Sequence, residues 1–168
     1  LDEIPAGQWD GLRPDGNPFL SHAFLSGLET TGCIRNELGW QGWHLAWYRQ
    51  EQVVAALPGY LKGNSHGEFV FDWSWAQAHE LAGGRYYPKL LCAVPYTPVT
   101  GPRLLTGTGP DRALLQQALA RSLISESRRL GLSGVHLNFP STDDRHALEQ
   151  DPRWLLRQDV QFHWHNAG

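Results

Sequence analysis

The region between residues 89 and 139 constrains the fold most, because a long amphipathic stretch there is enclosed by two short apolar runs. Pro110 and Asp111 suit a first helical turn, since proline is tolerated there and an acidic side chain favours the positive end of the helix dipole. Gly131 provides the stop. The face of this expected helix carries Leu115, Ala118, Leu119, Ser122 and Leu123 at helical spacing. Residues 89–94 and 134–139 are expected to be buried strands on either side of it.

The remaining segments predict an α/β (α+β) fold, a mixed sheet with an antiparallel first half and a crossover second half. Ser21 and Ser141 are suitable helix caps, and Pro58 implies an edge, a bulge or an early end of its strand. The expected elements are an irregular lead-in at 1–20, helices at 21–32 and 141–148, strands at 43–49, 52–61 and 67–71, and a final alternating strand at 159–166.

Charge and composition exclude several classes of function. The formal net charge is −3, and the one adjacent basic pair, Arg128-Arg129, is no substitute for a basic patch, so no nucleic-acid footprint is visible. Cys33 and Cys92 have neither metal nor redox spacing and are expected to be free thiols. No apolar run is long enough for a membrane span and no signal peptide opens the chain, so we expect a cytoplasmic protein.

The 168 residues suit one domain. The chain begins at Leu1 and contains no methionine, whereas a natural reading frame starts with one. We therefore expect a piece of a longer polypeptide.

Several motifs occur in order along almost the whole chain, from Asn17 to Asn166. They are Asn17-Pro-Phe-Leu-Ser-His22, Glu68-Phe-Val-Phe-Asp-Trp73, Tyr86-Tyr-Pro-Lys-Leu90, Val94-Pro-Tyr-Thr-Pro-Val-Thr-Gly-Pro-Arg103, His136-Leu-Asn-Phe139 and Gln161-Phe-His-Trp-His-Asn166. In these motifs the chain resembles a bacterial family of Fem-like proteins tied to peptidoglycan biosynthesis or recognition.

The resemblance implies a GNAT-like acyltransferase fold, a mixed central sheet with helices on both faces. It also implies that residues 1–168 are the N-terminal half of a protein with two GNAT-type halves. The C-terminal half of the same protein would then be a partner of this chain. The chain would hold one wall of a substrate site shared between the two halves. The implied substrate is a small molecule or a cell-wall precursor.

Glu68 and Asp72 are the candidate catalytic residues. They flank an apolar run and are four apart, so in a strand both would face the same side. Either one is a candidate general base toward an acceptor amine. The alternative is an exposed Glu68 and an Asp72 that caps the following turn.

Tyr86, Tyr87, Lys89 and Arg103 form the best candidate ligand site. Two phenols and two cations beside a proline-rich wall suit recognition of a carboxylate or phosphate, with ring faces for a sugar. Trp73 is a further substrate-binding candidate, because aromatic rings line pockets for flat or sugar-like ligands. The alternative is tyrosines half in the core and cations at the surface.

Arg103, Gly107 and Gly109 precede the long helix, where a GNAT enzyme usually cradles the pyrophosphate of acyl-CoA on backbone N–H groups. The spacing from Arg103 to Gly107 is one residue longer than the usual pattern. Acyl-CoA is therefore a possible cofactor, although Fem-type relatives do not need it, and an ordinary glycine-rich turn is the alternative.

His163 and His165 would share one face of the final strand. Such a pair can bind zinc, with His136 as a third ligand. The resemblance gives no support for a metal, and no metal is predicted. We expect these imidazoles to bond to neighbouring strands or to face the missing half, within the substrate site.

The sequence thus favours a half-domain that transfers an acyl or aminoacyl group to an amine, and the resemblance implies a peptidoglycan precursor as the acceptor. One alternative is a non-catalytic module that recognises peptidoglycan or a protein. Another is an acetyl-CoA-dependent N-acetyltransferase, which requires open N–H groups in the Gly107/Gly109 turn. Convergence of a carboxylate with Tyr86, Lys89 and Arg103 on one cleft would favour the transferase.

Overall fold

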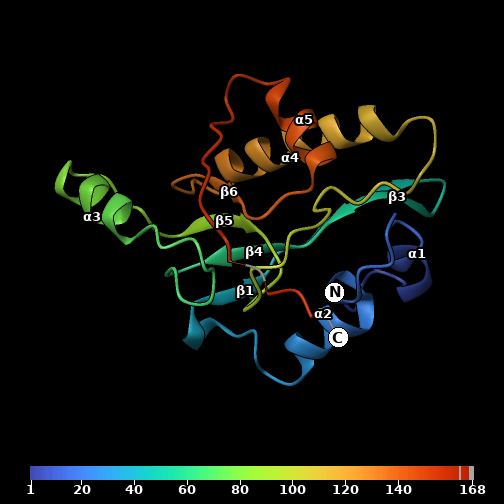
Figure 1. Ribbon diagram of the computed structural model, residues 1–168, viewed down its shortest axis with the longest axis horizontal. Coiled ribbons are helices and arrows are strands. Elements are labelled where there is room, and N and C mark those ends of the chain that lie inside the picture. The colour runs from blue at the N-terminus through green and yellow to red at the C-terminus, as the bar shows by residue number, and fades with distance from the viewer. Residues whose placement is uncertain (163, 167–168) are drawn as a thin grey trace.

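The computed structural model describes residues 1–162 and 164–166. A four-stranded sheet runs through its centre in the order β1-β4-β5-β6 (Figure 1). Its antiparallel part comprises β1 (Trp40–Gly42), β4 (Gly59–Lys62) and β5 (Lys89–Cys92). The last strand, β6 (Val135–Leu137), is parallel to β5 and is reached through the long helix α4 (Arg112–Arg129). The fold is therefore mixed α+β, and the predicted crossover in its second half is confirmed.

Strands β2 (Leu45–Arg49) and β3 (Gln52–Leu57) form a separate two-stranded sheet. Their turn places Gln50 and Glu51 in the left-handed region, with φ of 49° and 66°. Pro58 ends β3, and the chain continues directly into β4 of the larger sheet. The early end was one of the outcomes expected for this proline, which cannot donate to a ladder.

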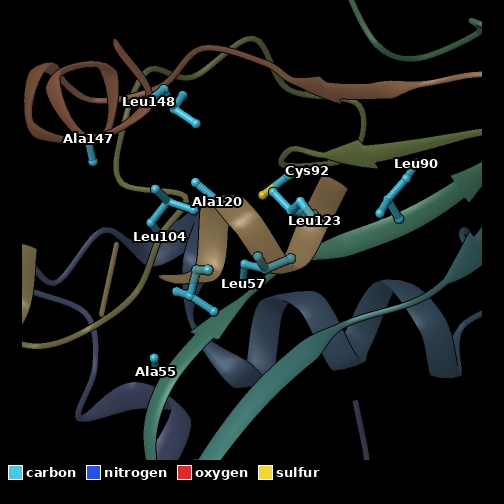
Figure 2. Close-up of a cluster of buried hydrophobic side chains, with 10 residues drawn as sticks. Ala55, Leu57, Leu90, Cys92, Leu104, Ala120, Leu123, Ala147 and Leu148 are labelled. Atoms are coloured by element: carbon cyan, nitrogen blue, oxygen red, sulfur yellow. The ribbon is translucent and has the colours of Figure 1, made fainter. Parts of the chain in front are cut away.

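Helices lie on both sides of the strands. In Figure 1, α4 and α5 (Thr142–Glu149) are on one side, and α1 (Ala6–Asp10) and α2 (His22–Thr30) are on the other. The alternation of β5 explains this, because Leu90 and Cys92 join the core under α4 while Leu91 packs in a second cluster with Trp40. Figure 2 shows the first cluster, in which Leu104, Ala120 and Leu123 surround Cys92.

The predicted caps hold two of the helices. The Ser21 hydroxyl accepts the Phe24 N–H at the start of α2. Ser141 and Asp144 form a reciprocal capping box at the start of α5. Two short 3₁₀ turns, η1 (Pro18–Leu20) and η2 (Asn36–Leu38), lie before β1 in the chain.

The lead-in is more ordered than expected, since it contains both α1 and η1. Trp9 and Leu20 are fully buried, and the Trp9 indole N–H donates to the Leu20 carbonyl at 2.8 Å. These two apolar anchors fix a segment that its Gly and Pro content alone predicts to be irregular.

Two strand predictions were wrong. Residues 67–71 form a loop, because Phe69 and Phe71 adopt left-handed φ values of 60° and 48°. The loop leads into α3 (Trp73–Leu81), which projects from the body in Figure 1. The described residues 159–162 and 164–166 hold no strand. Their alternating side chains are exposed, as with Val160 and Phe162, and no neighbouring strand pairs with them in the described part.

Candidate active site

Lys89 is the centre of a buried ionic cluster at the start of β5. Its side chain is fully buried, and its ammonium lies 2.6 Å from Asp72 Oδ2 and 2.9 Å from Glu68 Oε2. The ammonium also donates to the Ser65 hydroxyl at 3.2 Å. The two predicted carboxylates and the predicted lysine therefore converge, and we call Ser65, Glu68, Asp72, Tyr86 and Lys89 the lysine cluster.

A looped backbone brings the two carboxylates inward. Gly67 has φ +78°, and a Cβ there would lie 2.6 Å from the Tyr96 ring, so this position needs glycine. Phe69 and Phe71, which are left-handed and exposed, lie between Glu68 and Asp72, whose side chains are buried. The prediction that the carboxylates share a face was right, although a loop and not a strand achieves it.

Asp72 occupies the N-cap position of α3 without making a side-chain cap bond. Its Oδ2 instead accepts hydrogen bonds from Lys89 and, at 2.7 Å, from the Tyr86 hydroxyl. Burial alone would raise the pKa of Asp72, but side-chain hydrogen bonds, that from Lys89 foremost, lower the pKa to about 2. Asp72 is thus held in place as an anion. Because its side chain makes no cap bond, the expectation that it caps the following turn is wrong.

Glu68 differs in its electrostatics. Its side chain has no exposed surface, and burial raises the pKa of Glu68 although the Lys89 ammonium opposes this. Oε1 of Glu68 has no hydrogen-bond partner among the described residues. The expectation of an exposed Glu68 is therefore wrong.

Aromatic and imidazole rings border the cluster. The Tyr86 and Tyr87 rings meet edge to face at 5.0 Å, and their centroids lie 5.2 and 5.6 Å from the Lys89 ammonium. The Tyr87 hydroxyl is 2.7 Å from that of Ser65. Ser133, just before β6, donates to the carbonyls of Tyr86 and Pro88 and so ties this segment to the edge strand.

His136, in the middle of β6, is a partly exposed titratable group beside Asp72. Its Nδ1 lies 3.8 Å from Asp72 Oδ2, its ring is 5.9 Å from that of Tyr86, and 29% of its side chain is exposed. Burial, with the nearby Lys89 charge, lowers the pKa of His136 to about 4. The sequence suggested His136 only as a third zinc ligand, because nothing in it indicates which strand lies beside Lys89.

Lys62 is a second fully buried lysine that the sequence did not single out. It is the register partner of Lys89 in the β4–β5 ladder, and its ammonium lies 3.7 Å from the centroid of the Trp40 ring. It donates to the His66 carbonyl at 3.2 Å. Burial lowers the pKa of Lys62 to about 8. Only the strand register reveals this pairing.

Arg103 lies apart from the lysine cluster and is fully buried. Its guanidinium donates to backbone carbonyls, and its backbone N–H donates to Asp144 Oδ2 at 2.6 Å. The four carbonyls are those of Val99, Gly101, Pro102 and Asn138. This arginine organises the irregular segment between β5 and α4, and no bond joins it to Tyr86 or Lys89.

The glycine turn before α4 is partly engaged by the protein itself. The Gly107 N–H donates to the Leu12 carbonyl at 2.9 Å, and Gly107 has φ +65°. Gly109 is exposed, and its carbonyl accepts the Arg112 N–H. A pyrophosphate at this turn would find neither the Arg103 guanidinium nor the Gly107 N–H free.

The other predicted site residues are placed separately. Trp73 is 56% exposed at the first turn of α3, with its ring 6.0 Å from that of Phe71. His165 is exposed, and His163 lies outside the described residues. Both cysteines are free thiols, as predicted, with Cys33 exposed and Cys92 buried.

Three side chains in and beside the lysine cluster are of types that bind metal ions. One ligand atom each from Glu68, Asp72 and His136 lies within 4.8 Å of the other two. The Lys89 ammonium is already within 3 Å of both carboxylates, so the protein supplies its own cation there. The residues present therefore suit a lysine-centred cluster better than a divalent metal.

An open groove lies away from the lysine cluster. A groove of about 740 Å³ runs between α2 and β1 past Glu29, Trp40 and His44. In it, Glu29 Oε1 is 2.6 Å from His44 Nε2. No residue of the lysine cluster lines this groove.

Fold and site together define an α+β domain with a buried lysine–dicarboxylate cluster bordered by tyrosines. Residues 1–168 match the FemAB-like family, described as peptidoglycan biosynthesis/recognition, and the chain belongs to that family. No curated protein and no solved structure matches it. None of the helices in the described residues is both long and apolar enough to cross a membrane.

Proposed function

We propose that this chain is the GNAT-like half of a transferase that moves an acyl or aminoacyl group from an activated ester or thioester to an amine on a peptidoglycan precursor. The observation that carries the proposal is the convergence of Glu68 and Asp72 on Lys89 and Tyr86. Sequence-distant groups that share a buried charge network, with perturbed pKa values, are typical of functional sites.

The order of elements supports the same proposal. An antiparallel region followed by the parallel β5–α4–β6 unit is the arrangement expected of a GNAT-like domain. The half-exposed rings of Tyr86 and Tyr87 are suited to contact the sugar or peptide of an acceptor. A second half of the protein would complete the site by facing the rings of Tyr86 and Tyr87.

A recognition module is the second candidate, and one observation favours it. Lys89 is neutralised by two carboxylates inside the protein, so the cluster is stable without a substrate. Phe71, Trp73 and Trp75 are exposed nearby in sequence and present ring faces to solvent. Such a surface could bind a saccharide without any chemistry.

A mass-spectrometric transfer assay separates these functions. The full-length protein, in which this chain is joined to the proposed second half, is incubated with a nucleotide-linked muramyl-pentapeptide and, in parallel, with aminoacyl-tRNA or acetyl-CoA as donor. A mass gain of one aminoacyl group supports the proposal, and a gain of one acetyl group supports the acetyl-CoA alternative. Asp72→Asn should abolish either gain, while Asp143→Asn, whose carboxylate makes an exposed pair with Arg112, should not.

Binding is measured on the same samples by thermal unfolding. At a precursor concentration a hundredfold above Kd, the free energy of unfolding should rise by about 2.7 kcal/mol. Stabilisation without transfer in both donor arms would identify a recognition module. Neither stabilisation nor transfer would contradict both functions.

A further inference from the structure

We infer that His136, and not Glu68 or Asp72, is the group that accepts the proton from the attacking amine, and that Asp72 positions its ring. This inference rests on the proposed transfer reaction and assigns a residue role that the sequence did not suggest. A general base must reach the proton that it removes.

Neither carboxylate has that access. The Glu68 side chain is fully buried, and 4% of the Asp72 side chain is exposed. Asp72 Oδ2 already accepts hydrogen bonds from Lys89 and Tyr86. A substrate amine would have to displace these bonds to reach that oxygen.

His136 combines access with a carboxylate partner. It lies on β6, an edge strand of the four-stranded sheet, and 29% of its side chain is exposed. Nδ1 is 3.8 Å from Asp72 Oδ2, and Oδ1 of the same carboxylate has no hydrogen-bond partner among the described residues, so an Nδ1 proton can be aimed at this carboxylate without displacing Lys89 or Tyr86. A proton on Nδ1 would then point at Asp72 and leave the lone pair on Nε2 for the substrate.

The charge state suits the same role. Burial and the Lys89 charge lower the pKa of His136 to about 4, so the lone pair of its imidazole is free at physiological pH, and the Asp72 charge opposes this shift and strengthens the base. Lys89 also keeps Asp72 ionised and in place, since its ammonium lies 2.6 Å from that carboxylate. The lysine cluster thereby acts through Asp72 on the ring of His136.

The resulting step balances. The amine nitrogen attacks the carbonyl carbon of the activated donor, and a C–N bond forms. One amine proton passes to His136 Nε2. The C–O bond of an ester, or the C–S bond of a thioester, breaks, and the imidazolium returns the proton to the departing oxygen or sulfur.

His136→Gln is compared with His79→Gln in the transfer assay above. His79 is a matched control because its ring also contacts that of Tyr86, at 6.1 Å, and it is exposed on α3. His136→Gln should lower kcat about 100-fold or more without changing KM. A His136→Gly variant should regain part of its rate with added imidazole, which a purely structural role would not produce.

A second readout does not depend on turnover. The His136 imidazole is followed by nitrogen-15 NMR between pH 3 and 9, and its reaction with diethyl pyrocarbonate by peptide mass spectrometry. A neutral ring at pH 7 that is modified at this site supports the inference. A ring that is protonated at pH 7, or that resists modification, overturns it whether or not transfer is detected.

The two proposals can fail separately. If the wild type transfers a group and His136→Gln transfers it equally fast, the base assignment is overturned and the transferase stands. If the wild type transfers nothing from either donor, the transferase is overturned and the base assignment falls with it.

Discussion

Lys89 and Arg103 are both fully buried cations in neighbouring segments, yet their surroundings differ completely. The Arg103 guanidinium is satisfied by four backbone carbonyls. The Lys89 ammonium is satisfied by side chains, which are two carboxylates and a hydroxyl, and is bordered by half-exposed rings. A cation that binds backbone fixes a fold, whereas one that binds ionisable side chains sets their charge and position. This contrast separates a structural cation from a candidate functional one.

The largest effect is expected at the structural cation. Arg103→Met would leave the carbonyls of Val99, Gly101 and Asn138 without this donor in a buried region. Breaking such a network should lower the free energy of unfolding by about 3–5 kcal/mol, measured by urea unfolding. The exposed Arg112→Met, which breaks a surface pair with Asp143, should cost less than about 1 kcal/mol. Equal losses in the two variants would contradict the structural role of Arg103.

Lys89→Met should also destabilise the protein by about 3 kcal/mol, because two buried carboxylates lose their counter-charge. The comparison is sharpened by the triple variant Lys89→Met, Glu68→Gln and Asp72→Asn. It should recover most of the lost stability in urea unfolding, since its cluster is uncharged. A triple variant that is no more stable than Lys89→Met would show that packing, and not charge balance, determines stability here.

His136 should make stability depend on pH. Its pKa is about 4 in the folded protein and 6.5 as an ordinary imidazole, so the folded state favours the neutral ring. The contribution is fully present above pH 6.5 and is lost as pH falls toward 4, by about 3 kcal/mol. Burial also lowers the pKa of His44, so His44 contributes to the same pH dependence in the wild type and in the variant His136→Gln. The free energy of unfolding is therefore measured at pH 7.5 and 4.5 for the wild type and for His136→Gln. The wild type should lose more between the two pH values, and equal losses would contradict the lowered pKa of His136.

Tyr86→Phe should have the smallest effect on stability. It removes one hydrogen bond to Asp72 while keeping the ring, which costs about 1 kcal/mol in urea unfolding. The pKa of Asp72 should rise because that bond favours its ionised form. A carboxyl titration by carbon-13 NMR that shows no rise would mean that Lys89 alone fixes the charge of Asp72.

The sequence predicted those parts of the molecule whose signals are local. The periodicity of 115–123 and the caps Ser21 and Ser141 placed three helices correctly. The strand at 67–71 was wrong because Phe69 and Phe71 are left-handed in a loop whose buried residues, Glu68 and Asp72, pair with the distant Lys89, and no local pattern records such long-range pairs. The final strand was wrong because alternation specifies a strand only when a neighbouring strand is present.

The candidate site was only partly predictable, for a related reason. Glu68 and Asp72 were named as one candidate group, and Tyr86 and Lys89 as part of another, but the sequence left open whether the two groups meet, as they do in the structure. The positions of Lys62 and His136 beside the cluster were missed because they depend on the β4–β5 and β5–β6 registers. Arg103 was grouped with the ligand site from its charge, although whether a cation meets carbonyls or a ligand depends on the fold around it.

The most direct test of the contrast between the two cations is a chemical-shift titration of the chain with a nucleotide-linked muramyl-pentapeptide. If the lysine cluster is the functional site, the shifts of Tyr86, Tyr87 and His136 move with the precursor, and those from Arg103 to Gly109 stay constant. Shifts confined to Arg103–Gly109 would contradict the account and place ligand binding at the turn before α4.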